Sequence, residues 1–220
     1  MRIISGKYKG RTIKMPEGIR PTQNKVRKAL FDILGDIEGL SFLELFAGSG
    51  AVGFEALSQG AKKVVFVERE KRYCKIIQQN LRYVSQLASE RVSGLTSERV
   101  NGLKNLTGEP ANRLTGTPEP ANRQTILNMD SIQAIILLFH KKQKFDIIFL
   151  DPPYYGDLSK KTLQTLGAYD ILAPNGFIVV QHFKKDKLPG ESGQLVLVKE
   201  ARYGDTFLSF YRKNIDSLAS

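Results

Sequence analysis

Short apolar runs that alternate with amphipathic segments constrain the fold more than any other feature of the chain. The runs expected to form strands are Phe42–Phe46, Val64–Glu68, Thr125–Met129, Phe145–Leu150 and Gly176–His182. A segment with helical character follows each of the first four runs, and such alternation is typical of a parallel sheet with helices on both faces. The C-terminal stretch, Leu195–Arg212, instead predicts a hairpin. We therefore expect a Rossmann-like, doubly wound α/β fold with a mostly parallel sheet and an antiparallel C-terminal edge.

Length and composition bound the class of protein. A chain of 220 residues with 41% hydrophobic residues can form a core of its own, so we expect a single domain over residues 1–220. Cys74 is the only cysteine, which excludes an internal disulfide and any metal cluster built from cysteines. No apolar run approaches the roughly 20 residues that span a bilayer, and the N-terminus lacks the apolar stretch of a signal peptide. We expect a cytoplasmic monomer with no membrane partner and no metal site.

The first 35 residues carry a large excess of positive charge and are expected to form a basic arm. Nine of the first 28 residues are basic and only Glu17 is acidic, which leaves a charge of +8 there out of a total of +11. The pattern predicts a small β-hairpin around a glycine turn at 6–10, and then a helix that Thr22 caps and Gly35 ends. Such a concentration of charge suits a polyanionic partner. A basic face that only keeps the protein in solution explains the charge equally well.

One stretch, residues 88–124, breaks the alternation of strands and helices. SERVSGLT at 89–96 is followed by SERVNGLK at 97–104, and LTGEPANR at 106–113 is followed by LTGTPEPANR at 114–123. These direct duplications are rich in Gly, Pro, Asn and Thr, and two units without a shared apolar face do not make a solenoid. We expect an inserted, exposed and mobile surface loop. A tolerated duplication explains it more simply than a binding site does.

A glycine-rich turn follows the first expected strand of the sheet. The segment ELFAGSGAVG at 44–53 places Gly48 and Gly50 where the backbone can turn tightly and approach a ligand. Alone, this spacing is a weak signal. Glu68 ends the second strand, where an acid can accept both hydroxyls of a ribose, although an ordinary surface carboxylate would look the same. Asp130 ends the third strand and is placed to accept from the amino group of an adenine.

The fourth strand ends in FLDPPY, which carries the clearest chemical signal. Pro152 and Pro153 follow Asp151, fix the backbone and remove two N–H donors, so the local carbonyl groups remain as acceptors. Tyr154 adds a ring face on which a planar base can stack. These features suit a planar group with an exocyclic amine. Asp151 and the Pro152 carbonyl would hold the two amine hydrogens while the nitrogen lone pair attacks a sulfonium methyl. A simple turn after a strand is the alternative explanation for Asp-Pro.

ELFAGSG, VFVE and FLDPPY occur in the order found in class I methyltransferases, and the chain resembles that family. RIISGKYKGR, RPTQNKVRKALFDIL and RYGDTFLSFY narrow the resemblance to the bacterial small-subunit rRNA guanine-N2 methyltransferases, over nearly the whole chain apart from 88–124. The resemblance implies S-adenosylmethionine as the cofactor and small-subunit rRNA, or the assembled small subunit, as the partner. The DPPY motif is shared with DNA adenine methyltransferases, so it does not choose the substrate.

The resemblance also implies roles for individual positions. Cofactor contacts are expected from Glu44, Phe46, Gly48, Gly50, Glu68 and Asp130. Contacts to the target amine are expected from Asp151, Pro152 and Tyr154. Contacts to RNA are expected from Arg20, Thr22, Lys25, Arg27, Lys7, Lys9 and Arg11. The chain departs from the residues frequent in the family at Gln23, Asn24, Lys25, Lys28 and Glu44.

These expectations combine into one hypothesis with three rivals. The hypothesis is methyl transfer from S-adenosylmethionine to the N2 amine of a guanine in small-subunit rRNA, with the base flipped into a pocket. A DNA adenine-N6 methyltransferase would use the same amine chemistry, but 220 residues leave no room for a separate target-recognition domain. A nucleic-acid-binding module without catalysis would require damage to FAGSG or DPPY, and the sequence shows none. An enzyme that uses a nicotinamide cofactor would leave DPPY unexplained.

Overall fold

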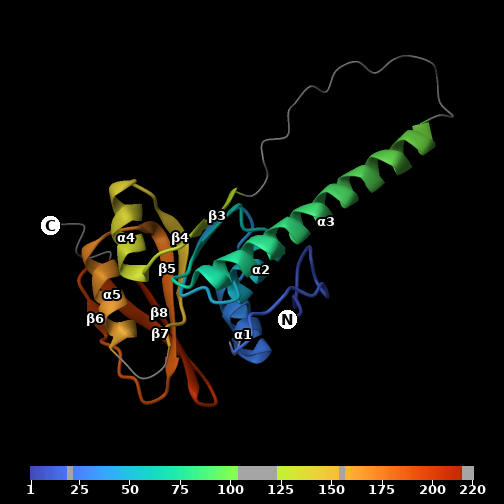
Figure 1. The fold of residues 1–220 in the computed structure, drawn as a ribbon. Helices are drawn as coiled ribbons and strands as arrows, with labels where there is room; N and C mark the ends of the chain where they lie inside the picture. Colours follow the sequence, from blue (N-terminus) through green and yellow to red (C-terminus); the bar gives the residue numbers. More distant parts are fainter. Residues whose placement is uncertain (19–21, 104–122, 154–156, 215–220) are drawn as a thin grey trace.

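The protein folds around one mixed β-sheet (Figure 1). The computed structural model describes residues 1–18, 22–103, 123–153 and 157–214. Within these residues the strands lie in the order β3-β2-β1-β4-β5-β8-β7-β6. Their bounds are β1 Ser41–Leu45, β2 Lys63–Val67, β3 Arg123–Leu127, β4 Phe145–Leu150, β5 Leu172–Phe183, β6 Glu191–Ser192, β7 Leu195–Tyr203 and β8 Thr206–Lys213. Strands β3 to β5 in this order are parallel, and β8, β7 and β6 continue the sheet in antiparallel pairs. The predicted Rossmann-like sheet with an antiparallel C-terminal edge is confirmed.

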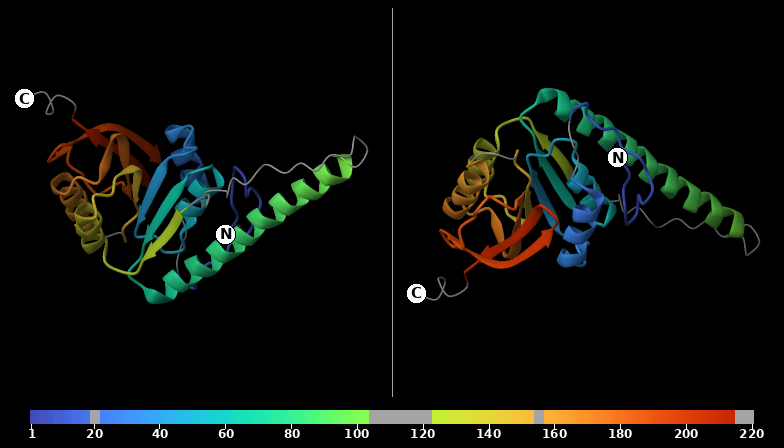
Figure 2. Two further views of the ribbon diagram at one scale, coloured as in Figure 1. Left: turned by 90° about the horizontal axis from the view of Figure 1, so that it is seen from above. Right: turned by 90° about the horizontal axis from the view of Figure 1, so that it is seen from below.

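Helices cover both faces of the sheet (Figure 2). Their bounds are α1 Asn24–Leu34, α2 Ala51–Ser58, α3 Lys71–Leu103, α4 Ser131–His140 and α5 Leu158–Ala168. Helices α1, α2 and α3 pack on one face, and α4 and α5 pack on the other. Successive strand residues point to opposite faces, so Phe42 of β1 lies in the first core and Leu43 in the second. Among the described residues, no helix is both long and apolar enough to cross a membrane.

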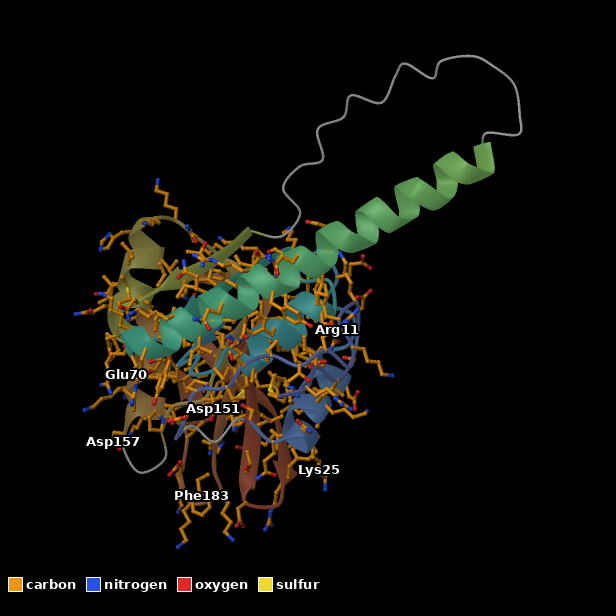
Figure 3. The ribbon with its side chains drawn as sticks, turned by 45° about the vertical axis from the view of Figure 1, so that its right-hand side comes forward. Arg11, Lys25, Glu70, Asp151, Asp157 and Phe183 are labelled. Carbon is orange, nitrogen blue, oxygen red and sulfur yellow. The ribbon has the colours of Figure 1, made fainter. Side chains whose placement is uncertain are left out.

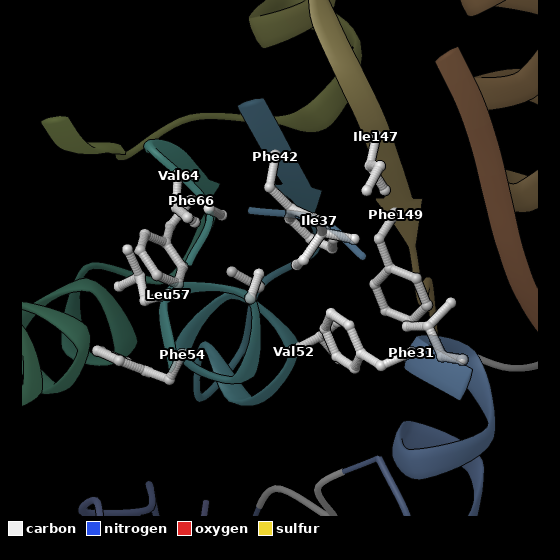
Figure 4. Close-up of a cluster of buried hydrophobic side chains, with 14 of the residues drawn as sticks. Phe31, Ile37, Phe42, Val52, Phe54, Leu57, Val64, Phe66, Ile147 and Phe149 are labelled. Carbon is white, nitrogen blue, oxygen red and sulfur yellow. The ribbon is translucent and has the colours of Figure 1, made fainter. Parts of the chain in front are cut away.

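The core under α1 and α2 is rich in aromatic rings (Figure 4). Phe54 of α2 and Phe66 of β2 pack with their ring centroids 5.3 Å apart, and Phe31 of α1 lies 6.2 Å from Phe42. Burial of each such side chain contributes roughly 1.5–3 kcal/mol. The packing fixes both helices on the sheet and therefore positions the loops that lead into them.

The N-terminal arm is held to α2 instead of forming a full hairpin. The predicted hairpin is reduced to a single antiparallel bridge between Arg2 and Thr12. The backbone N–H groups of Ile4 and Ser5 donate to the carboxylate of Glu55 in α2, at 3.0 and 2.8 Å. Because these donors are used by a side chain, they do not extend the pairing between the two halves of the arm.

The predicted loop over 88–124 is wrong for its first part, because α3 continues through it to Leu103. The helix runs beyond the edge of the sheet (Figure 1). The first duplicated pair contains helix-favouring Glu, Arg and Leu, it continues an established helix, and no proline occurs in it. Its glycines, Gly94 and Gly102, cost only about 1 kcal/mol each in a helix, so they do not end it. Residues 104–122 lie outside the described part of the chain, and 123–124 begin β3.

Arg27 lies in the interior, so the RNA contact predicted for it is wrong. Its side chain is 0% exposed, and its Nε lies 3.4 Å from Oε2 of Glu55. The guanidinium also donates to the backbone oxygen of Arg2 at 2.8 Å and to Oδ1 of Asn24 at 3.1 Å. Arg27 shares the buried side of α1 with Val26, and Glu55 supplies the opposite charge that makes burial possible. The pair joins α1, α2 and the arm.

Removal of this buried cation should destabilise the fold. We expect Arg27→Met to lower the free energy of unfolding by about 3–5 kcal/mol, because Glu55 keeps its burial and loses its cation. Urea unfolding at pH 7 measures the change. Lys25→Met, on the exposed side of the same helix, is the matched control and should change stability by less than about 0.5 kcal/mol. A loss below about 1 kcal/mol for Arg27→Met would contradict this role.

Candidate active site

A cavity of about 770 Å³ opens at the carboxyl ends of the parallel strands. The strand order reverses between β1 and β4, and ligands of open α/β sheets bind at such a reversal. The predicted site residues that line the cavity are Thr22, Glu44, Phe46, Gly48, Glu68, Asp130, Asp151 and Pro152. The fold therefore gathers at one place most of the residues that the sequence singled out.

The turn after β1 has a backbone conformation that favours glycine. Gly48 and Gly50 have φ angles of 54° and 74°, in the left-handed region that other residues rarely adopt. Phe46, just before the turn, also has a φ of 62°, and strain of this kind is typical of functional sites. Gly50 is the N-cap residue of α2, so this helix begins beside the cavity.

Glu44 fastens the start of α2 to the sheet. Its carboxylate accepts from the backbone N–H groups of Val52 and Gly53, at 3.2 and 3.0 Å. A Cβ at position 53 would lie only 2.7 Å from Oε2 of Glu44 and 2.4 Å from the ring of Phe66, so this contact requires glycine. Burial raises the pKa of Glu44 to about 8, although the two backbone hydrogen bonds lower it.

Glu68 and Asp130 each hold a turn while they line the cavity. Oε2 of Glu68 accepts from the N–H of Gly48, and Oε1 accepts from the N–H of Glu70, both at 2.7 Å. A carboxylate oxygen can accept more than one hydrogen bond, so both oxygens remain able to accept from neighbouring hydroxyls. Asp130 caps α4 through Oδ1, which accepts from the N–H of Ile132 at 2.8 Å. Any ligand that Asp130 contacts therefore shares the carboxylate with a helix cap.

Asp151 follows β4, and Figure 3 shows it between Asp157 and Lys25. Oδ2 of Asp151 accepts from the hydroxyl of Thr22 at 3.1 Å. Burial raises the pKa of Asp151 to about 7, and hydrogen bonds from Thr22 and Gln181 lower it. Thr22 does not cap α1 as predicted: the N-cap residue is Gln23, and its side chain makes no capping hydrogen bond. Near neutral pH, Asp151 can therefore both accept and release a proton.

The remaining predicted residues lie outside the cavity or outside the described part of the chain. Lys7, Lys9, Arg11 and Lys25 are exposed and do not line the cavity. Figure 3 shows Arg11 and Lys25 near the arm and α1, away from the side of α4 and α5. Arg20 and Tyr154 fall among the residues that the structure does not describe.

Gln181 is a site residue that the sequence interpretation missed. It lies in β5, its side chain is 4% exposed, and it lines the cavity beside Asp151. Its Oε1 has no hydrogen-bond partner among the described residues, a condition that costs roughly 1–3 kcal/mol for a buried polar atom. The available signal was a glutamine after the apolar run IVV, at the carboxyl end of an expected strand.

Comparison with known proteins connects this geometry to a family. The family model described as Conserved hypothetical protein 95 matches residues 1–113 and 111–212. The chain belongs to this family, that of the ribosomal RNA small subunit methyltransferases D. YlbH of Bacillus subtilis is 31% identical over 216 residues, which span 97% of this chain and 99% of that protein. The Ribosomal RNA small subunit methyltransferase D of Haemophilus influenzae is 29% identical over 215 residues, 96% of this chain and 93% of that protein.

Solved structures agree with this placement. The hypothetical protein TTHA0928 of Thermus thermophilus is 27% identical, with a TM-score of 0.70 over 96% of this chain and 99% of that chain. The Escherichia coli protein yhhF is similar in fold, with a TM-score of 0.71 and 23% identity over 97% of this chain and 98% of that chain.

The pKa of Glu44 makes the stability of the protein depend on pH. The folded state has a pKa of about 8 at this group, against an ordinary value of 4.5, so it binds more protons than the unfolded state. The corresponding stability is fully present below pH 4.5 and is lost as the pH rises toward 8. An amide does not titrate, so we expect Glu44→Gln to reduce the loss of unfolding free energy between pH 5 and pH 8.

Urea unfolding at pH 5, 6.5 and 8 measures this effect. Glu38→Gln, at an exposed position, is the control and should keep the pH dependence of the wild type. If Glu44→Gln loses as much stability as the wild type over this range, Glu44 is not the group responsible.

Proposed function

We propose that the protein transfers a methyl group from S-adenosylmethionine to the N2 amine of a guanine in small-subunit rRNA. The observation that carries this proposal is the position of Asp151. It lies at the carboxyl end of β4, in the same cavity as the glycine turn after β1 and Glu68. A site for a nucleoside-containing cofactor and an acceptor for an amine therefore face one space.

S-adenosylmethionine is the cofactor of this family, and the residues present suit it. Gly48 lets the backbone approach a ligand, and Glu68 can accept from the two hydroxyls of a ribose. Asp130 lies where it can accept from an adenine amino group. A structural neighbour of 16% identity and TM-score 0.51, SMU.776, is described as complexed with SAH. When bound, S-adenosylmethionine supplies a methyl group on a positively charged sulfur.

The acceptors beside the cavity prepare the amine. The lone pair of an exocyclic amine is delocalised into the base, which makes the nitrogen a poor nucleophile. Asp151 and the carbonyl of Pro152 would each accept one amine hydrogen, which favours a lone pair directed at the methyl carbon. The methyl group would pass from sulfur to this nitrogen, and the electrons of the broken carbon–sulfur bond would remain on sulfur. Positive charge on the nitrogen is stabilised by Asp151, which then takes the released proton.

The proposed RNA substrate is supported by the positive charge of the arm and α1 and by the names of related proteins. A guanine inside a folded RNA must leave its stack to reach the cavity, and the exposed cations of the arm and α1 would hold the phosphates around it. Relatives of this chain carry the name Ribosomal RNA small subunit methyltransferase D. We place the enzyme in the cytoplasm as a monomer that acts on small-subunit rRNA or on the assembled subunit.

Loss of the Asp151 carboxylate should remove turnover and spare cofactor binding. We expect Asp151→Ala to lower methyl transfer by a factor on the order of a hundred or more, with S-adenosylmethionine binding nearly unchanged. The assay follows labelled methyl from S-adenosylmethionine into unmodified small subunits, free rRNA and duplex DNA, and calorimetry measures cofactor binding.

The labelled product separates the proposal from its rivals. N2-methylguanine in rRNA, absent with Asp151→Ala, is the expected outcome. N6-methyladenine in DNA would identify a DNA adenine methyltransferase instead. Bound cofactor without any transfer would identify a silent binding module, and equal loss of binding and turnover in Asp151→Ala would mean a structural role for this residue.

The arm should contribute phosphate contacts that salt weakens. Each contact adds roughly 0.7–0.9 to the slope of log affinity against log salt concentration. For a double variant Lys9→Ala/Arg11→Ala we therefore expect the slope for small-subunit rRNA to fall by about 1.5. Fluorescence anisotropy at several salt concentrations measures the slope. Lys141→Ala/Lys161→Ala removes two exposed lysines at α4 and α5, on the face of the sheet opposite the arm, and should leave the slope unchanged. Equal slopes for both double variants would exclude the arm from the RNA interface.

A further inference from the structure

Gln181 carries a polar atom that the folded protein leaves without a partner. Its Oε1 is buried and accepts no hydrogen bond from the described residues, although the side chain lines the cavity. Buried polar atoms in native proteins nearly always have a partner, so each exception calls for an explanation. A ligand that brings a hydrogen-bond donor to this part of the cavity would supply one.

The strand register determines what lies beside this side chain. β4 and β5 are parallel and pair Leu150 with Val180, so the next residues, Asp151 and Gln181, are neighbours at the carboxyl ends of the two strands. The side chain of Gln181 faces Asp151 and, as a donor toward the carboxylate, lowers the pKa of Asp151. An ionised carboxylate only accepts, so the amide donates through Nε2, and this contact leaves Oε1 as an acceptor. Rotation of the amide by half a turn would point Oε1, an acceptor, at the Asp151 carboxylate.

We propose that Gln181 selects the base: Oε1 accepts the ring N1–H of the target guanine while Asp151 and the Pro152 carbonyl hold the N2 amine. This inference rests on the proposed function and assigns a specificity-determining residue within the same site. Asp151 has two roles in this arrangement, because it receives the amine and also orients the amide that reads the ring.

The hydrogen-bonding edge of the base explains why two neighbouring acceptors would favour guanine over adenine. Guanine presents its N1–H donor directly beside the N2 amine, so both acceptors find hydrogens. Adenine presents its amine beside a bare N1, whose lone pair would face Oε1 and leave two buried acceptors opposed. A site built to hydrogen-bond one substrate group strongly rejects analogues that lack it. Thr22, the other neighbour of Asp151, donates its hydroxyl to the carboxylate, so Gln181 provides the additional acceptor.

The test changes one atom group of the substrate and one side chain of the enzyme. The guanine found to be methylated is replaced in the small subunit by 2-aminopurine, which keeps the amine at C2 and has a bare N1. For the wild type we expect kcat/KM to be at least about 100-fold lower for 2-aminopurine than for guanine. For Gln181→Met, kcat/KM for guanine should fall about 10- to 100-fold and that for 2-aminopurine should stay within about threefold. The preference of the enzyme for guanine over 2-aminopurine would then be largely lost.

Controls separate base selection from support of the fold. Gln181→Leu is a second variant without the amide, and Gln164→Leu, exposed on α5, should retain wild-type preference. Unchanged thermal unfolding and S-adenosylmethionine binding identify the variants that are folded. An equal fall of kcat/KM for both bases would overturn base selection and leave Gln181 as a positioning residue for Asp151. Absence of guanine methylation by the wild type would overturn the proposed function itself, and this inference with it.

Discussion

The reversal of strand order between β1 and β4 is the constraint on which the site depends. The loop after β1 leads into α2 on one face of the sheet, and the loop after β4 leads toward α5 on the other. Two loops that leave in opposite directions open a space between them. Gly48 lies on the first loop and Asp151 on the second, and both line this space. Under the proposed function, a cofactor held at one loop and a base held at the other would therefore meet without rearrangement of the sheet.

Carboxylates give this space its electrostatic character. Burial raises the pKa of Glu44 to about 8 and that of Asp151 to about 7, and the charges of Asp151 and Glu68 add to the rise at Glu44. Like charges in a buried site oppose one another's ionisation. A cation that enters reduces this repulsion, and the sulfonium of S-adenosylmethionine is a cation. In the proposed reaction, the same field would favour the positive charge that develops on the amine nitrogen. One arrangement of acids thus serves both binding and chemistry.

The fold and the strand-end residues could be predicted because each depends on local sequence. Parallel strands buried on both faces leave continuous apolar runs, and the acids that end them stand out. Contacts between segments that are distant in the chain produce no such local pattern in the sequence. A hydroxyl before a helix predicts a cap, yet Thr22 bonds Asp151, 129 residues away. A basic residue in a basic arm predicts a surface position, yet Arg27 is buried because Glu55 lies opposite. The helix over 88–103 was not predicted, because the glycine, asparagine and threonine content of the duplications indicated a loop. The structure shows that α3 continues through this segment.

Helix α1 connects the proposed RNA surface to the reacting carboxylate. One side of α1 is anchored through Arg27 to Glu55, the opposite side exposes Lys25, and Thr22 at its entry bonds Asp151. The hydroxyl of Thr22 lowers the pKa of Asp151, which is about 7 with this bond in place. Any displacement of the helix entry that breaks the bond raises this pKa and reduces the ionised fraction at neutral pH. Anchoring of α1 in the core therefore does more than stabilise the fold: in the proposed reaction it would keep Asp151 ready to accept a proton while RNA binds to the exposed side of the same helix.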